Sequence, residues 1–558
     1  MSLVEGLRRV AERRSGHGVH LVRRGREVAA LSFGDLYQQA GRVATGLLTR
    51  GVAPGDRVAV VLPTSVEFAG AFFGVLAAGA VAVPLPAPPP FSSSRTYLRR
   101  TTMALRQSRV RLVLTSESIA PVLTRSLPTA SGPASVVDVR GVMAQEATFV
   151  DRADSHDALV QYTSGTSSDP RGVVLSHGNV AAGVHAIASG TRLTDTDIGC
   201  NWLPLFHDMG LIGSFLTPAM HDVDIYLQPP EDFLRAPVDW LRTISRVRAT
   251  FTMAPDSGYR YALQRTGPEA VGDMDLSAWR IAVNGAEPVD EQLQRAFIRR
   301  FSRAGLAETV FLPAYGLAEA TLAVTFPPLG RPTKTLRVSR AALGRGRCET
   351  VTGAPGTYRE LVSVGRPVAG MEVRLADDRA HPLGEGVVGE IQVRGASVTA
   401  GYERHPEATR QVARPGGWVA TGDLGVRHEE ELYVVGRTKE TVIVFGANHY
   451  ASDIEAVVRD IVGLGVHGVL AHQAEGHDGS GLGLLVESTE RAPAAQERMS
   501  ARIRSALSAE LGITATTITF VGRGKIPRTS SGKMLRRSGM EVDERGAADR
   551  RGRVLLPE

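Results

Sequence analysis

Helical and strand patterns alternate along residues 30–150 of this 558-residue chain. Residues 33–50 have the apolar spacing of an amphipathic helix, and residues 56–62, DRVAVVL, are typical of a buried strand. A second helical pattern over 65–78 leads into an apolar strand over 80–84. Because strands that alternate with helices usually pair in parallel, this segment predicts a doubly wound α/β architecture.

The pattern changes near residue 365, where short strands alternate apolar and polar side chains. Strands over 372–376, 389–394 and 431–435 predict a small β-rich subdomain. The chain beyond residue 440 mixes helical and strand patterns, as a small α+β domain does. We therefore predict a large N-terminal domain over 1–436 with the β-rich subdomain at about 363–436, a hinge over 437–440, a small mobile C-terminal domain over 441–540, and a disordered polar tail over 541–558.

Composition argues against several classes of protein. The formal net charge of +6 comes from scattered arginines without a dense basic block, so we expect no nucleic-acid binding. Cys200 and Cys348 lie too far apart in sequence to suggest a disulfide framework or a zinc motif. The first 14 residues lack the apolar core of a signal peptide, and the apolar run over 69–85 is short and rich in glycine. We expect a cytoplasmic protein without a membrane partner, as a monomer or weak dimer.

Lysine is rare in this chain, with four lysines against sixty arginines. An ammonium is a compact point charge on a flexible stem, whereas a guanidinium is a wide planar fork. We therefore expect a lysine in such a chain to mark a site where arginine would not serve. Lys533 ends the loop sequence TSSGK over 529–533, and we expect its charge to fit between several oxygens.

The strongest local signal is the run ALVQYTSGTSSDPRGV over 158–173. It joins two predicted strands through a loop that is rich in hydroxyl groups and glycine. Backbone N–H groups and hydroxyls of such a loop can surround phosphate oxygens. The loop is not a Walker A motif, because Gly-Lys-Ser/Thr is missing. A polar surface hairpin is the structural alternative.

The order of residues in this loop closely resembles the phosphate loop of the adenylate-forming enzymes, a superfamily that includes acyl-CoA synthetases, nonribosomal peptide adenylation domains and luciferases. Further motifs resemble those of the superfamily in the same order, and the resemblance spans about residues 30–537. They are WLPLFHDMG at 202–210, NGAEP at 284–288, YGLAEAT at 315–321, TGDLG at 421–425, GRTK at 436–439 and PRTSSGK at 527–533.

The resemblance implies ATP and Mg²⁺ as cofactors and assigns a role to each site residue. Lys533 is expected to be the catalytic lysine, with His207 near the acyl pocket. Glu319 is expected to hold Mg²⁺, and Lys439 is the expected hinge position. The expected ATP or AMP contacts, with Tyr315 stacked on adenine and Asp423 on the ribose, are Thr163, Ser164, Gly165, Thr166, Ser167, Ser168, Arg171, Gly285, Ala286, Glu287, Ala314, Tyr315, Gly316, Asp423 and Arg437.

Several details resemble one branch, the fatty acyl-AMP ligases, most closely. They include SSDP at 167–170, the WLPLFHDMGLIG and YGLAEATL sequences, and about forty residues over 322–363 that are long enough for an insertion typical of that branch. The resemblance implies that a fatty or fatty-like acid becomes acyl-AMP, and that the acyl group then passes to the phosphopantetheine of an acyl carrier protein.

Alternatives remain at the level of the sequence. An acyl-CoA synthetase shares the first half-reaction, and a catalytically silent acyl- or nucleotide-binding module would keep the fold. Aryl, terpenoid and amino acid substrates stay open. Arg171 stands where the superfamily usually has lysine, but a guanidinium can still contact phosphate. Each of three site residues also has a purely structural alternative. Asp423 could be a turn residue, Glu319 could satisfy a helix dipole, and Tyr315 could serve core packing alone.

Overall fold

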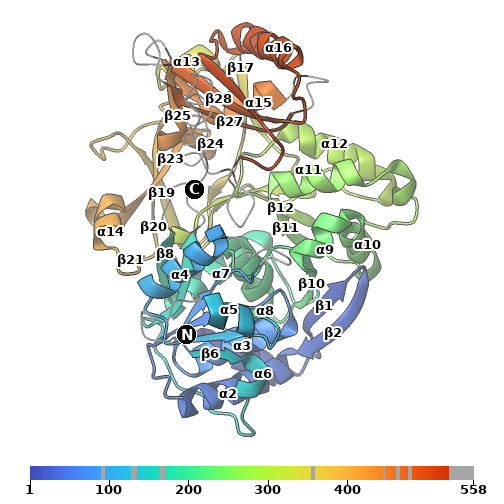
Figure 1. Cartoon of the computed structure of the whole chain (residues 1–558), viewed down its shortest axis with the longest axis vertical. Coiled ribbons are helices and arrows are strands. Elements are labelled where there is room, and N and C mark those ends of the chain that lie inside the picture. Colours follow the sequence, from blue (N-terminus) through green and yellow to red (C-terminus); the bar gives the residue numbers. More distant parts are fainter. Residues whose placement is uncertain are drawn as a thin grey trace.

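The computed structural model describes residues 1–88, 95–126, 135–163, 170–352, 358–444, 447–459, 461, 466–474, 481–526 and 534 (Figure 1). The predicted tail over 541–558 lies outside the described residues. So do Lys533 and five residues of the predicted phosphate loop, namely Ser164, Gly165, Thr166, Ser167 and Ser168.

The first large sheet has the strand order β21-β8-β7-β4-β3-β5-β6 and contains the predicted βα alternation. Strands β3 (Arg57–Val60), β4 (Val81–Pro84), β5 (Leu112–Thr115), β6 (Ser135–Asp138) and β7 (Asp157–Thr163) pair in parallel. Helices α2 (Phe33–Thr49) and α3 (Val66–Ala77) pack on each other beside this sheet. Ser32 caps α2, since its hydroxyl accepts a hydrogen bond from the N–H of Asp35. The parallel architecture predicted from residues 30–150 is thus confirmed.

The second large sheet has the order β13-β12-β11-β9-β10-β1-β2. Its parallel strands are β9 (Ile198–Asn201), β10 (Asp224–Leu227), β11 (Phe251–Ala254), β12 (Ile281–Asn284) and β13 (Phe311–Pro313). The N-terminal hairpin of β1 (Gly18–Arg23) and β2 (Arg26–Ser32) extends this sheet through β10. Residues distant in sequence therefore complete one sheet.

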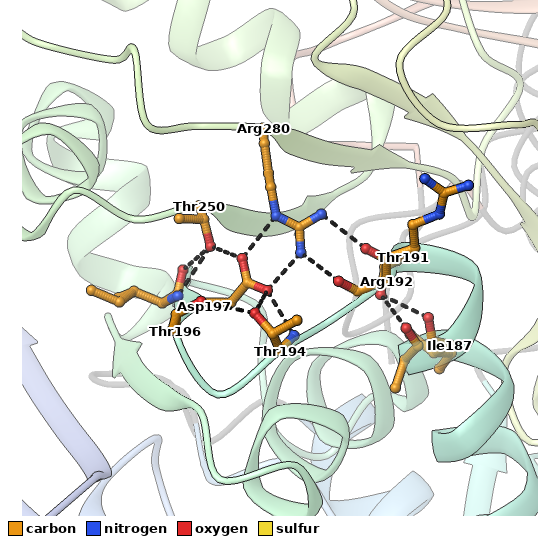
Figure 2. A network of polar contacts seen from close by, with 10 residues as sticks. Ile187, Thr191, Arg192, Thr194, Thr196, Asp197, Thr250 and Arg280 are labelled. Atoms are coloured by element: carbon orange, nitrogen blue, oxygen red, sulfur yellow. Dashed lines mark hydrogen bonds and ion pairs between the residues drawn. The ribbon is translucent and has the colours of Figure 1, made fainter.

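An ion pair between the half-buried Arg280 and the buried Asp197 lies at the amino ends of this second sheet (Figure 2). The Arg280 guanidinium donates from Nε and Nη2 to the two oxygens of Asp197, at 2.8 and 2.6 Å. Thr250 donates its hydroxyl to the same carboxylate at 2.6 Å. Arg280 also donates to the carbonyl of Thr191 at the end of α7 (His177–Thr191). The network joins the segments that enter β9, β11 and β12 and stabilises their alignment.

An antiparallel sheet forms the predicted β-rich part of the chain. It contains β19 (Met371–Ala376), β20 (Gly389–Gly395), β23 (Trp418–His428) and β24 (Glu431–Arg437), together with the short β22 (Ala413–Arg414). A neighbouring sheet pairs β14 (Tyr315–Gly316), β15 (Ala323–Phe326) and β18 (Arg366–Pro367).

The segment over 322–363 adds a hairpin of β16 (Thr335–Ser339) and β17 (Tyr358–Val362), with helix α13 (Arg340–Gly344) after β16. Apolar side chains of this hairpin pack with Tyr433 and Val435 of β24. Lys334, which has no assigned role in the sequence motifs, pairs with Glu429 at 2.8 Å. The segment is therefore packed on the β-rich sheet.

The last part of the described chain has its own apolar core. After the short turn Thr438–Glu440, it contains the hairpin of β25 (Thr441–Val444) and β26 (Ala447–Tyr450), helices α15 (Ala451–Arg459) and α16 (Pro493–Leu511), and strands β27 (Val466–Ala474), β28 (Gly481–Ser488) and β29 (Thr517–Val521). In Figure 1 these elements lie at the end of the molecule opposite α2 and α6 (Val139–Val142). No helix within the described ranges is both long and apolar enough to cross a bilayer.

Candidate active site

Asp423 lies where two β-rich sheets meet, and both of its carboxylate oxygens have a partner. The Tyr315 hydroxyl donates to Oδ2 at 2.8 Å, and Arg437 donates from Nε to Oδ1 at 2.9 Å. Asp423 and Arg437 are direct cross-strand partners on β23 and β24, which sets this pair by register. Burial and the Asp423 charge raise the pKa of the Tyr315 phenol, so it stays a neutral donor.

The Asp423 carboxylate can accept further hydrogen bonds, because an ionised carboxylate has about four lone-pair directions. Its side chain is only 9% exposed, while that of Arg437 is half exposed. The Asp423 charge in turn raises the pKa of Arg437. Asp423 is part of strand β23, and its carboxylate bonds to Tyr315 and Arg437. A simple Asx turn, the structural alternative for this residue, does not describe these contacts.

Glu319 lies in a short 3-10 turn, Ala318–Ala320, directly after β14. Its Oε1 accepts a hydrogen bond from the Tyr402 hydroxyl at 2.6 Å. Burial, and then the charges of Asp208 and Asp423, raise the pKa of the Glu319 carboxyl. The hydrogen bond of Tyr315 to Asp423 joins the YGLAE and TGD motifs, and the charge of Asp208 in the FHD motif also acts on Glu319.

These surroundings fit a divalent cation at Glu319. A carboxylate that is buried near two other acidic groups is stabilised when a cation is bound. Within the described ranges, no cluster of three or more protein ligands forms a complete cage. Such a donor set suits Mg²⁺, which usually takes one or two carboxylates and completes its shell with phosphate oxygens and water.

The predicted adenine turn follows β12, at the carboxyl edge of the second sheet. Ala286 has a φ of 65°, in the left-handed region that disfavours a side chain, and it is exposed. Glu287 accepts a hydrogen bond from the N–H of Ser257 at 2.9 Å. A Cβ added to Gly285 would approach the carbonyl oxygen of Ala314 at 2.8 Å. Gly285 and Ala314 therefore lie against each other, with Ala314 N donating to the Asn284 carbonyl.

Gly316 shows the same close approach on the other side of Tyr315. A Cβ at this position would meet the Leu322 carbonyl oxygen at 1.9 Å. Only glycine permits the backbone contact that closes the YGLAE loop.

The two ends of the predicted phosphate loop are paired in the first sheet. Thr163 of β7 is opposite Arg171 of β8 (Arg171–Ser176), and β7 and β8 run antiparallel. The Arg171 guanidinium lies 5.6 Å from the ring centroid of Tyr402, within the range of a cation–π contact. Arg171 is thus near both the loop and the Glu319 partner.

His207 comes just before a π-helical segment, Met209–Leu216, which the sequence patterns do not predict. Its Nδ1 lies 2.6 Å from Oδ1 of Asp208, which also accepts from the N–H of Met209. Widened helical turns of this type often occur at functional sites, because they re-aim a side chain or carbonyl. The Asp208 carboxylate therefore orients the His207 ring. Within the described ranges, neither residue belongs to a cluster of three or more possible metal ligands.

Tyr402 contacts Glu319 but belongs to none of the sequence motifs. It lies on β21 (Gly401–Tyr402), about eighty residues from Glu319 in sequence, and only the tertiary fold reveals their contact. The predicted hinge residue Lys439 is exposed in the turn after β24. Among the described residues of the predicted nucleotide site, Tyr315, Asp423 and Arg437 are joined by hydrogen bonds, while Lys439 lies on the turn that follows Arg437.

Comparison with known proteins places this geometry in context. Residues 7–403 match the family model described as AMP-binding enzyme. A 4-hydroxyphenylalkanoate adenylyltransferase of Mycobacterium marinum is 34% identical, over 91% of this chain and 85% of that protein. A medium-chain-fatty-acid–[acyl-carrier-protein] ligase, JamA of Moorena producens, is 32% identical over 92% of this chain and 89% of its own length.

The fold is also similar to a solved structure from a study of fatty acyl-adenylate ligases of E. coli and L. pneumophila. That structure has a TM-score of 0.90 and 29% sequence identity, and the match covers 98% of both chains. The similarity therefore extends well beyond the nucleotide motifs, to the whole length of the chain.

Proposed function

This chain belongs to the AMP-binding enzyme family and is an adenylate-forming ligase, and we propose that it loads a fatty or fatty-like acid onto an acyl carrier protein. In the first step a carboxylate oxygen bonds to the α-phosphorus of ATP, and pyrophosphate leaves. In the second step the phosphopantetheine thiol gives up its proton and bonds to the acyl carbon, and AMP leaves.

The observation that carries this proposal is the convergence of Asp423, Tyr315, Arg437 and Glu319 at one site. Asp423 offers acceptors for ribose hydroxyls, held in place by the Tyr315 and Arg437 hydrogen bonds. A carboxylate fixed in this way loses little freedom when it binds a nucleotide. The exposed part of Arg437 provides positive charge beside it.

Attack of a carboxylate on a phosphate brings two anions together, so the site must supply positive charge that is best placed in the transition state. We assign this task to Arg171 at the end of the phosphate loop and to Lys533. Mg²⁺ held by Glu319 would neutralise charge on the leaving pyrophosphate. His207, oriented by Asp208, would line the acyl side of the site.

Carrier protein as acceptor is supported by the similarity to the ligase from Moorena producens, whose name includes an acyl carrier protein. The same relatives include an aryl-acid enzyme, so the acid panel in any test must contain both kinds of substrate. The predicted hinge at Lys439 would let the small domain change position between the two half-reactions.

The first test is ATP–pyrophosphate exchange with a panel of medium-chain, long-chain and hydroxyphenyl-alkanoic acids. We expect exchange with at least one fatty or arylalkanoic acid, and none without acid. Absence of exchange with every acid, in protein that binds ATP, would contradict an adenylating function.

The second test presents preformed acyl-AMP with CoA and holo carrier protein in competition. We expect the acyl group on the carrier. Efficient acyl-CoA formation without carrier loading would instead assign the chain to the acyl-CoA synthetases.

A further inference from the structure

Tyr402 connects two parts of the site that approach from different sheets. Its hydroxyl donates to Glu319 at 2.6 Å, while its backbone pairs with Val173 of β8, the strand that leaves the phosphate loop. The neighbouring N–H of Glu403 donates to the Gly172 carbonyl at 2.7 Å. One short segment thus contacts both the expected cation ligand and the base of the expected phosphate loop.

The same segment also holds the backbone of Glu319. The N–H of Thr399 donates to the Glu319 carbonyl oxygen at 2.8 Å, two residues before β21 begins. Glu319 is therefore bound twice, at its main chain by Thr399 and at its carboxylate by Tyr402. A movement of this segment would carry the carboxylate with it.

The backbone around Tyr402 is held by contacts with two other elements, helix α14 (Pro406–Val412) and strand β3. The N–H of Tyr402 donates to the Thr409 hydroxyl at 3.0 Å, which joins β21 to α14. The next residue, Glu403, is 4% exposed and accepts from Arg57 of β3 at 3.0 Å. The phenol therefore extends from an anchored backbone and has little freedom to turn away from Glu319.

Arg171 contacts the aromatic ring of Tyr402. Its guanidinium lies 5.6 Å from the centre of the Tyr402 ring. The ring is attracted to this cation while its hydroxyl is hydrogen-bonded to Glu319. One tyrosine thus contacts an anionic and a cationic group, both of which are expected to face the phosphates of ATP.

We propose that Tyr402 is a positioning residue that holds the Glu319 carboxylate in the orientation needed for Mg²⁺·ATP and links it to the phosphate-loop strand β8. The inference rests on the proposed function and deepens it, because the motif residues do not include this contact. A hydrogen-bond donor on one carboxylate oxygen restricts the rotation of the carboxylate. Hydrogen bonds of this kind to a metal-binding side chain change the affinity of the site for its metal ion.

The test is Tyr402→Phe, which keeps the aromatic ring but removes the hydroxyl. Calorimetry would measure the binding of ATP with Mg²⁺ and of ATP in EDTA. We expect the dissociation constant for Mg²⁺·ATP to rise about 10-fold or more, while metal-free ATP binds nearly as in the wild type. Unchanged Mg²⁺·ATP binding would overturn the proposal, and so would equal weakening in both conditions.

Tyr259→Phe is the matched control. Tyr259 is also a buried phenol, and its hydroxyl donates to the carbonyl of Val283 in β12 at 2.9 Å. It should lower the melting temperature to a similar degree without changing the ratio of the two dissociation constants. A shift of that ratio in Tyr259→Phe would mean that lost stability, rather than the Glu319 contact, explains the effect.

A double-mutant cycle identifies the route of the effect. If Tyr402 acts through Glu319, adding Tyr402→Phe to Glu319→Gln will cause no further loss of Mg²⁺·ATP affinity. If Tyr402→Phe weakens Mg²⁺·ATP binding as much in the Glu319→Gln variant as it does in the wild type, Tyr402 does not act through Glu319. Because these measurements use binding alone, they remain valid if no acid supports exchange, so failure of the proposed function and failure of this inference can be distinguished.

Discussion

At the scale of single residues, burial at the carboxyl edge of the second sheet shifts the pKa of Asp256. Asp256 begins helix α11 (Asp256–Arg265), and its Oδ1 accepts from Asn284 at 3.2 Å and from the N–H of Asp290 at 3.1 Å. Burial nevertheless outweighs these bonds and raises the pKa of Asp256 to about 6. The folded protein therefore holds a proton on Asp256 more tightly than the unfolded chain does.

This shift predicts a pH dependence of stability. Between about pH 4 and pH 6 the folded state binds more protons than the unfolded state, so the contribution of Asp256 to stability falls as the pH rises and is constant above this window. We expect the free energy of unfolding of the wild type, minus that of Asp256→Asn, to fall by up to about 3 kcal/mol from pH 4 to pH 7. Urea unfolding at several pH values measures this difference.

Asp275→Asn is the control for that measurement. Asp275 is exposed, and the Ser277 and Arg248 hydrogen bonds lower its pKa to about 2. Its contribution changes only below about pH 4, so the corresponding difference should be flat between pH 5 and pH 7. A flat difference for Asp256→Asn as well would contradict a raised pKa at that site.

Lys533 gives a second prediction at this scale, drawn from the sequence alone. If the scarcity of lysine marks a site where an ammonium must fit between oxygens, Lys533→Arg will remove adenylation although the charge is kept. We expect at least a 100-fold loss of exchange, on the order of 3 kcal/mol of transition-state stabilisation. Lys525→Arg, outside the motif, is the control and should exchange normally. Near-normal exchange by Lys533→Arg would refute the argument from composition.

The sequence motifs include Asp423, Tyr315 and Arg437, and the roles of these residues toward a nucleotide stay predictions. Tyr315 lies 108 residues before Asp423 and Arg437 lies 14 residues after it, and the structure joins all three by hydrogen bonds. Tyr402 was not predicted, since nothing near it in sequence indicates which side chain its hydroxyl meets. Contacts of that kind depend on strand pairing over two hundred residues, here between β21 and β8.

At the scale of elements, strands and helices with strong periodicity were predicted within a few residues. Helix α2 ends at Thr49 rather than Arg50, and β3 covers Arg57–Val60 within the predicted run. The π-helix at Met209–Leu216 was missed, since its apolar composition suits any buried helix. The addition of β1 and β2 to the second sheet was also missed, because local patterns carry no information on which distant strand will be the partner.

The ion pair at the entry of β9, β11 and β12 allows a test of element alignment. Arg280→Met leaves the Asp197 carboxylate, which is 5% exposed, with hydrogen bonds from Thr194 and Thr250 but without its cationic partner. Removing one member of a buried pair is strongly destabilising, and since Arg280 is about one-third exposed we expect about 2–3 kcal/mol in urea unfolding. Exchange activity per folded molecule should remain, because this network lies at the amino ends of the strands and the site at their carboxyl ends.

Arg248→Met is the matched variant for this prediction. Arg248 pairs with Asp275 where both side chains are more than half exposed, so its loss should cost less than about 1 kcal/mol. Equal destabilisation by the two variants would show that the buried network has no special part in strand alignment.

At the scale of the whole molecule, the segment over 322–363 contacts the last part of the chain through Arg359. The guanidinium donates to the Val435 carbonyl at 2.7 Å and lies 3.0 Å from Oδ1 of Asp453 in α15. It also lies 5.3 Å from the ring centre of Tyr450, which is 6% exposed. Arg359 therefore ties α15 and β26 to the β-rich sheet across the predicted hinge.

The role of this contact can be tested without reference to catalysis. Since Asp453 is enclosed between Arg359 and Arg340, removing Arg359 leaves a buried carboxylate with the more distant partner, at 3.7 Å. We expect Arg359→Met to raise amide hydrogen exchange in peptides covering β26 and α15 by about 10-fold, which corresponds to roughly 1.4 kcal/mol of lost protection. Peptides from the parallel sheets should exchange as in the wild type, because their core is separate.

Lys334→Met provides the comparison that makes this result specific to the contact. Lys334 belongs to the same segment, but its pair with Glu429 is exposed and stays within the β-rich part. If that variant raises exchange in β26 and α15 as much as Arg359→Met does, general loosening of the segment is the cause. If only Arg359→Met does so, the arrangement of the two parts depends on one buried guanidinium, and a hinge motion about Thr438–Glu440 must first break its contacts with Asp453 and Tyr450.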